Sequence, residues 1–132
     1  MKTALRLLAV LFVLLLAVPA QAAEPVTMEV LFMNHGPLRS TINNIRTIAA
    51  KYEGKVTVEW YDFDSKEGVA FMDSKGITEH IPLIIWINGS PTHKIDGTDV
   101  TFRGFPSGSG PAMFRGTWDM NMLEKALVNA IQ

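Results

Sequence analysis

Two histidines and a complete lack of cysteine define the chemistry open to this chain. His35 lies in the stretch MNHGPLRS, Met33 to Ser40, and His80 lies two residues before Pro82. An imidazole can ligate a metal, act as a base or hydrogen-bond to a partner's backbone. The 132 residues contain no cysteine, which excludes thiol–disulfide exchange, a cysteine nucleophile and a thiolate metal site.

A histidine metal site is one hypothesis that these residues allow. His35 and His80, with the thioether of Met33 or Met72 nearby, have the donor types of a copper or zinc site. The sequence offers no H-x-H or H-x₃-H pair, and His93 falls in a predicted hairpin. The hypothesis therefore depends on two separate loops approaching each other. The same two histidines could instead serve a small-molecule enzyme.

Other polar motifs favour structural roles. Ser40 and Ser107 lack the G-x-S-x-G setting of a hydrolase nucleophile. The segment GFPSGSGP, residues 104–111, lacks the G-K-S/T ending of a phosphate-binding loop. Asp64 follows a predicted strand, and capping of the next helix explains it without catalysis.

The N-terminus has the pattern of a secretory signal peptide. Lys2 and Arg6 precede an apolar run from Leu7 to Val18, and the small-residue site Ala20-Gln21-Ala22 follows. The run is shorter than the roughly 20 residues that cross a bilayer. We expect cleavage after Ala22, so that residues 1–22 form the signal peptide.

Residues 23–132 are then expected to form one domain, exported to the periplasm without a membrane anchor. No cysteine follows the cleavage site, so a lipid anchor there is excluded. The chain has 12 basic and 13 acidic side chains, and the leader would remove two of the basic ones. The small excess of acidic side chains argues against a nucleic-acid partner, because proteins that bind nucleic acid need a basic surface.

The periodicity of apolar residues predicts alternating strands and helices, followed by a hairpin and a last helix. The order β-α-β-α favours a parallel pair of strands, and Asp96-Gly97 is a hairpin dipeptide that adds antiparallel neighbours. The expected strands are Val26–Met33, Lys55–Phe63, Pro82–Ile87, His93–Ile95 and Val100–Phe102. The expected helices run from Pro37 to Gly54, from the Asp64 capping box to Gly76, and from a Thr117 cap to Ile131.

In this order of elements, the stretch Asn34-His35-Gly36-Pro37-Leu38-Arg39 resembles the active-site turn of the thioredoxin superfamily. That turn reads Trp-Cys-Gly-Pro-Cys-Lys/Arg between a buried strand and a helix. Ile81-Pro82, ahead of LIIWING, resembles the family's cis-proline at the start of a strand. The resemblance covers nearly the whole chain after the leader. It implies a three-layer α/β/α fold with a central mixed sheet.

The resemblance implies a domain that keeps the family's groove without its redox chemistry, because both cysteines are replaced. Gly36-Pro37 is then interpreted as retained for the backbone geometry of the turn. We expect no cofactor, and a periplasmic protein or peptide held by strand addition. The expected groove is lined by Asn34, His35, Gly36, Pro37, Ile81 and Pro82.

The groove hypothesis predicts the effect of two substitutions. His35→Glu or Ile81→Asp should weaken partner capture with little loss of thermal stability. In a third hypothesis, the long loop Gly104–Gly116 is the working surface and the turn is only a relic. Phe105, within this loop, and Trp118, just after it, are expected in the core.

Overall fold

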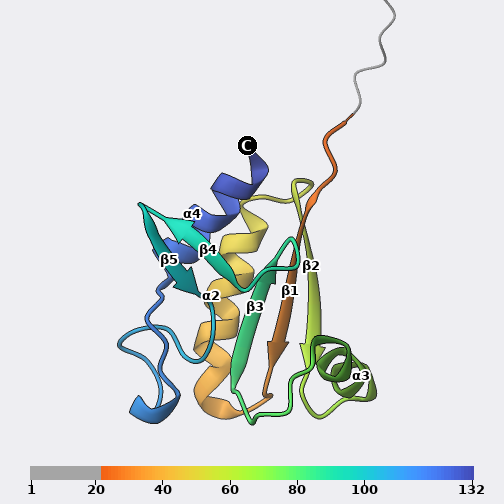
Figure 1. The fold of residues 1–132 in the computed structure, drawn as a ribbon, viewed down its shortest axis with the longest axis vertical. Helices are drawn as coiled ribbons and strands as arrows, with labels where there is room; N and C mark the ends of the chain where they lie inside the picture. Colours follow the sequence, from red (N-terminus) through yellow and green to blue (C-terminus); the bar gives the residue numbers. More distant parts are fainter. Residues whose placement is uncertain (1–21) are drawn as a thin grey trace, which may run out of the picture.

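The computed structural model describes residues 22–132, so the predicted signal peptide, except Ala22, lies outside the described residues. In this part of the chain no helix is long and apolar enough to cross a bilayer. The fold is mixed α/β (Figure 1). Its elements are β1 (Val26–Phe32), η1 (Gly36–Leu38), α2 (Arg39–Ala50), β2 (Val56–Asp62), α3 (Lys66–Lys75), β3 (Leu83–Ile87), β4 (Thr92–Ile95), β5 (Thr98–Thr101), η2 (Ala112–Phe114) and α4 (Met120–Ile131).

A mixed sheet of three strands forms the centre of the molecule, in the order β2-β1-β3. β1 pairs in parallel with β2, with Val26 opposite Val56, as the β-α-β order predicts. β3 pairs antiparallel with β1, with Met28 opposite Ile87. β1 is therefore the central strand, and its carboxyl end leads directly into the His35 turn.

The β4–β5 hairpin forms a sheet of its own, and the expectation that it extends the central sheet is only partly met. The segment after β5 runs along the outer edge of β3. There the Ile85 N–H donates to the Phe102 carbonyl at 3.0 Å, and the Gly104 N–H donates to the Leu83 carbonyl at 2.7 Å. The hairpin leaves β3 because Asn88-Gly89 turns the chain sharply, with both residues at positive φ.

The two faces of the sheet carry different helices (Figure 1). On one face, α2 and α4 bury the larger core, which contains Leu38 and also Trp118 and Phe105, as expected for the last two residues. On the other face, the shorter α3 covers a second cluster that includes Phe71 and Ile81.

The helix boundaries differ from the expected ones by a few residues. Ser65, not Asp64, caps α3: its Oγ accepts a hydrogen bond from the Gly68 N–H at 2.9 Å. Asp119, not Thr117, caps α4 through the Met122 N–H at 2.8 Å. Both residues have the extended backbone that a cap requires.

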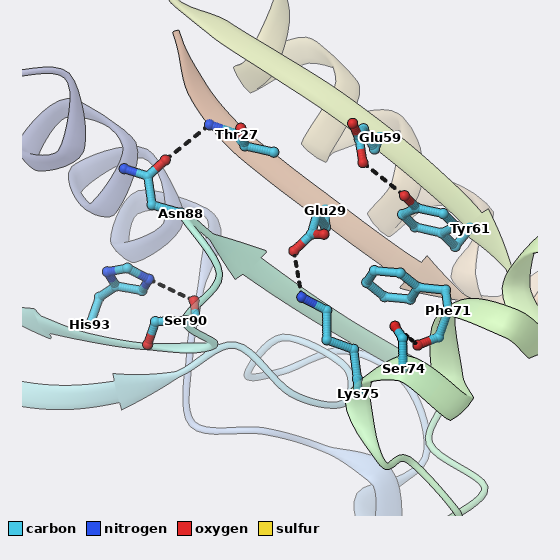
Figure 2. Close-up of polar contacts among 10 residues, drawn as sticks. All are labelled: Thr27, Glu29, Glu59, Tyr61, Phe71, Ser74, Lys75, Asn88, Ser90 and His93. Atoms are coloured by element: carbon cyan, nitrogen blue, oxygen red, sulfur yellow. Dashed lines mark hydrogen bonds and ion pairs between the residues drawn. The ribbon is translucent and has the colours of Figure 1, made fainter. Parts of the chain in front are cut away.

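Polar pairs also lie on the α3 face of the sheet (Figure 2). Lys75 forms an ion pair with Glu29 at 2.9 Å, and its ammonium group lies over the Phe71 ring. The Tyr61 hydroxyl donates to a Glu59 carboxylate oxygen at 2.7 Å. This hydrogen bond, with partial burial, raises the pKa of Tyr61 to about 12.

Candidate binding groove

The His35 turn joins β1 to α2 through a single 3₁₀ turn. His35 precedes that turn with extended backbone, and its carbonyl accepts a hydrogen bond from the Leu38 N–H at 3.0 Å. Pro37 lies in the first turn, where its missing N–H is no loss. Leu38 is buried, and the His35 side chain is exposed and caps no backbone group. The turn therefore presents its imidazole to solvent.

The backbone geometry of the turn does not require a glycine at position 36. Its φ lies outside the left-handed region, and an added Cβ would meet no atom within 4 Å. The interpretation that backbone geometry retains Gly36 is therefore wrong.

The Ile81–Pro82 peptide bond is trans, because the described residues contain no cis peptide bond. The cis-proline that the resemblance implied is thus absent from this structure. The trans form is the favoured one even before proline, by roughly 0.5–1 kcal/mol. Here the Pro82 carbonyl accepts a hydrogen bond from the Met33 N–H at 2.9 Å, which extends the pairing between β1 and β3 by one residue.

Ile81 is a buried residue. It is only 6% exposed and packs in the cluster beneath α3 with Phe71 and Trp86. The expectation that Ile81→Asp would spare stability is inconsistent with this burial, because the carboxylate would enter an apolar cluster.

An apolar pocket of about 190 Å³ lies between the turn and the residues that precede β3. Its lining includes both His35 and His80, the two side chains on which the metal hypothesis depends. Apart from these two imidazoles, all of its lining side chains are apolar. The lining residues are Met33, His35, Pro37, Leu38, His80, Pro82, Phe105, Pro111 and Phe114.

Three of these lining residues come from the long loop, which the sequence analysis treated as a rival surface. These residues are Phe105, Pro111 and Phe114. The loop is held by paired backbone bonds: the Phe105 N–H donates to the Phe114 carbonyl at 2.8 Å, and the Gly116 N–H donates to the Phe105 carbonyl at 2.7 Å. Groove and loop are thus one surface.

Two larger cavities flank the apolar pocket. The loop pocket, about 450 Å³, shares His80, Pro82 and Phe114 with it and is also lined by Ile81. The cationic pocket, about 280 Å³, shares Met33, His35 and Leu38 with it. Its other lining residues are Phe32, Asn34, Arg39, Ile42, Asn43 and Arg46. Asn34 therefore faces the cationic pocket, and Gly36 lines none of the three cavities.

Arg39, Asn43 and Arg46 line the cationic pocket, and no role was predicted for them from the sequence. Their spacing of four and three residues puts them on one face of α2. The signal was present, but only the position of the turn shows that this face borders the groove.

The histidine metal hypothesis receives limited support. His35 and His80 line the same pocket with Met33. The His80 ring also packs edge-on against Phe63, with centroids 5.5 Å apart. Among residues 22–132, no three His, Cys, Asp or Glu side chains are grouped to hold a metal ion. Met72 lies in the cluster beneath α3 and does not line the pocket.

The chain matches no known family model and no curated protein.

Proposed function

We propose that this protein is an exported, thioredoxin-like α/β/α domain without redox activity that binds an extended peptide segment of a periplasmic partner. The observation that carries the proposal is the apolar pocket between the His35 turn and Pro82. Pockets of this kind, apolar with a few polar groups at the rim, are typical binding sites.

The exposed apolar side chains beside the pocket support binding to a macromolecule. Met113 is 83% exposed and Phe114 is 39% exposed, and both lie on the loop that borders the pocket. Large side chains of this type favour an interface when they cluster at a cavity.

The backbone of Ile81 supports the extended conformation of the bound segment. Among the described residues, no backbone hydrogen bond uses the Ile81 N–H or carbonyl. The outer edge of β3 is already occupied by Phe102 and Gly104. A bound strand would therefore pair at Ile81 alone and place one side chain in the apolar pocket.

The experiment compares two short peptides with blocked ends, one with a central phenylalanine and one with a central alanine. Binding to the protein is followed by the shifts of its amide NMR resonances. We expect the phenylalanine peptide to bind roughly tenfold or more tightly, since burying one aromatic ring contributes about 1.5–3 kcal/mol. Equal binding of the two peptides, or no binding of either, would refute the proposal.

Two matched variants locate the site. Phe114→Ser removes an exposed ring from the pocket. It should lower the affinity for the phenylalanine peptide toward the affinity for the alanine peptide. Val69→Ser removes a similarly exposed apolar side chain, 47% accessible, from α3 on the other face of the sheet. It should leave binding unchanged. A loss of the same size in both variants would place the binding elsewhere.

A copper or zinc site is the second candidate function, favoured by the two imidazoles in one pocket. Addition of one equivalent of Cu²⁺ or Zn²⁺ should then shift or broaden the ring resonances of both His35 and His80. His93, whose Nε2 is 2.8 Å from the Ser90 carbonyl, is the internal control. Unchanged His35 and His80 resonances would exclude this candidate.

A further inference from the structure

The cationic pocket lies next to the apolar pocket and has a charge that the proposed function does not use. Its lining residues include Arg39 and Arg46, together with Asn34 and Asn43, and no acidic residue. We infer that the peptide segment bound in the groove is acidic, with carboxylates in the cationic pocket beside an apolar side chain in the apolar pocket. This inference rests on the proposed function and specifies the class of its ligand.

Neither arginine is used by the fold as an ion pair. The ion pairs among residues 22–132 involve Lys51, Lys75, Lys94, Arg103 and Lys125, and neither Arg39 nor Arg46. All five of these other cations already face a carboxylate of the chain. The two pocket arginines therefore retain their full attraction for an external anion.

Arg46 is also held in position before any ligand arrives. Its guanidinium carbon lies 4.9 Å from the centre of the Trp60 ring. Trp60 is in turn fixed edge-on by Phe32, with centroids 6.0 Å apart. A guanidinium that stacks on an aromatic face keeps the N–H groups in its plane available, and these match a carboxylate in a two-point contact.

The geometry of α2 sets the spacing that the ligand must span. Arg39 and Arg46 are seven residues apart, which is about 10 Å along a helix. A strand advances about 3.3 Å per residue, so carboxylates within three residues of one another can reach both arginines. Met33, His35 and Leu38 line both pockets, and one continuous segment can therefore occupy the two.

The experiment compares three heptapeptides with blocked ends and a central phenylalanine. The two residues on each side of the phenylalanine are glutamate in the first peptide, glutamine in the second and lysine in the third. Because each peptide has the same residues on both sides, the direction in which it binds does not affect the comparison. Affinities are measured by NMR titration at low salt. We expect the glutamate peptide to bind roughly tenfold more tightly than the glutamine peptide, equivalent to about 1.4 kcal/mol, and the lysine peptide to bind most weakly.

Salt separates the charged contact from the apolar one. Raising the ionic strength to about 0.5 M shortens the screening length to a few ångströms. The advantage of the glutamate peptide should disappear, and the affinity of the glutamine peptide should change little.

Charge variants then test the location. Arg39→Gln with Arg46→Gln should reduce the affinity for the glutamate peptide to that of the glutamine peptide. Lys55→Gln with Lys66→Gln removes the same charge from exposed positions outside the pocket, and should preserve the preference. The single variant Arg39→Gln, which leaves the Arg46–Trp60 contact intact, guards against a folding defect and should lose part of the preference.

The outcomes distinguish this inference from the proposed function. Equal affinity for the glutamate and glutamine peptides would overturn the acidic preference while leaving the apolar groove intact. An equal loss in the lysine control variant would assign the preference to net charge and also overturn the inference. Binding of none of the three peptides would overturn the groove itself.

Discussion

Ile81→Asp is expected to destabilise the fold, which is a prediction about a single side chain. The residue is 6% exposed in the cluster with Phe71 and Trp86. The cation that lies over these two rings, Lys75, is already paired with Glu29. A buried charge without a partner costs on the order of 3–5 kcal/mol. Urea denaturation should show a midpoint far below that of the wild type.

His35→Glu is the matched substitution in the exposed part of the same groove. The His35 side chain is exposed and caps no backbone group. The substitution should therefore change the free energy of unfolding by no more than about 0.5 kcal/mol, as is usual for surface positions. If Ile81→Asp behaved like His35→Glu, the side chain of Ile81 would not be buried as described.

Single residues also show where sequence reasoning reaches its limit. The burial of Leu38 follows from the apolar periodicity of its helix, which is a local signal. The trans bond at Pro82 and the inward direction of Ile81 depend on pairing with β1, some fifty residues away, and no local pattern encodes them. Resemblance to a family supplied an expectation for Pro82 that this backbone does not meet.

The capping of α3 provides a prediction for one element. Ser65→Ala removes the hydroxyl that accepts from Gly68 and should cost about 1 kcal/mol of unfolding free energy. Asp64→Ala, one residue earlier, removes no cap and should cost clearly less. Thermal denaturation of the two variants side by side makes the comparison, and an equal loss would mean that Asp64 shares the role.

Elements were predicted well where their signals are contiguous. Asn88-Gly89 and Asp96-Gly97 both turn with positive φ at each residue, as such dipeptides favour. The assembly of the groove had no such signal, because backbone hydrogen bonds within the long loop place Phe105 and Phe114 beside it. Gly104 illustrates this: an added Cβ would lie 2.3 Å from the Phe114 carbonyl oxygen, a contact invisible in sequence.

At the scale of the whole molecule, Glu124 connects α4 to the segment that directly follows α2, on the same face of the sheet. Its carboxylate accepts hydrogen bonds from the Lys51 ammonium at 3.0 Å and from the Tyr52 hydroxyl at 2.9 Å. These two contacts, the lysine first, hold the pKa of Glu124 below its ordinary value of 4.5. The α2–α4 contact is therefore sensitive to acid.

The sign of this effect follows from the lowered pKa. Because the folded protein holds Glu124 ionised more readily than the unfolded chain does, the stabilisation is present above pH 4.5 and is lost as the pH falls through the folded pKa. Glu124→Gln should lower the urea midpoint at pH 7 by a modest amount, and the difference from the wild type should shrink as the pH falls below 4.5. A difference that does not shrink on acidification would contradict the assignment.

The chain enters β1 and leaves α4 at the same end of the molecule, and the turn before α2 lies at the opposite end (Figure 1). A dye, an affinity handle or a solid support joined to Gln132 is consequently held far from the apolar and cationic pockets. Such a probe can report binding without competing for it, and molecules tethered in this way all present the groove outward to the surrounding solution.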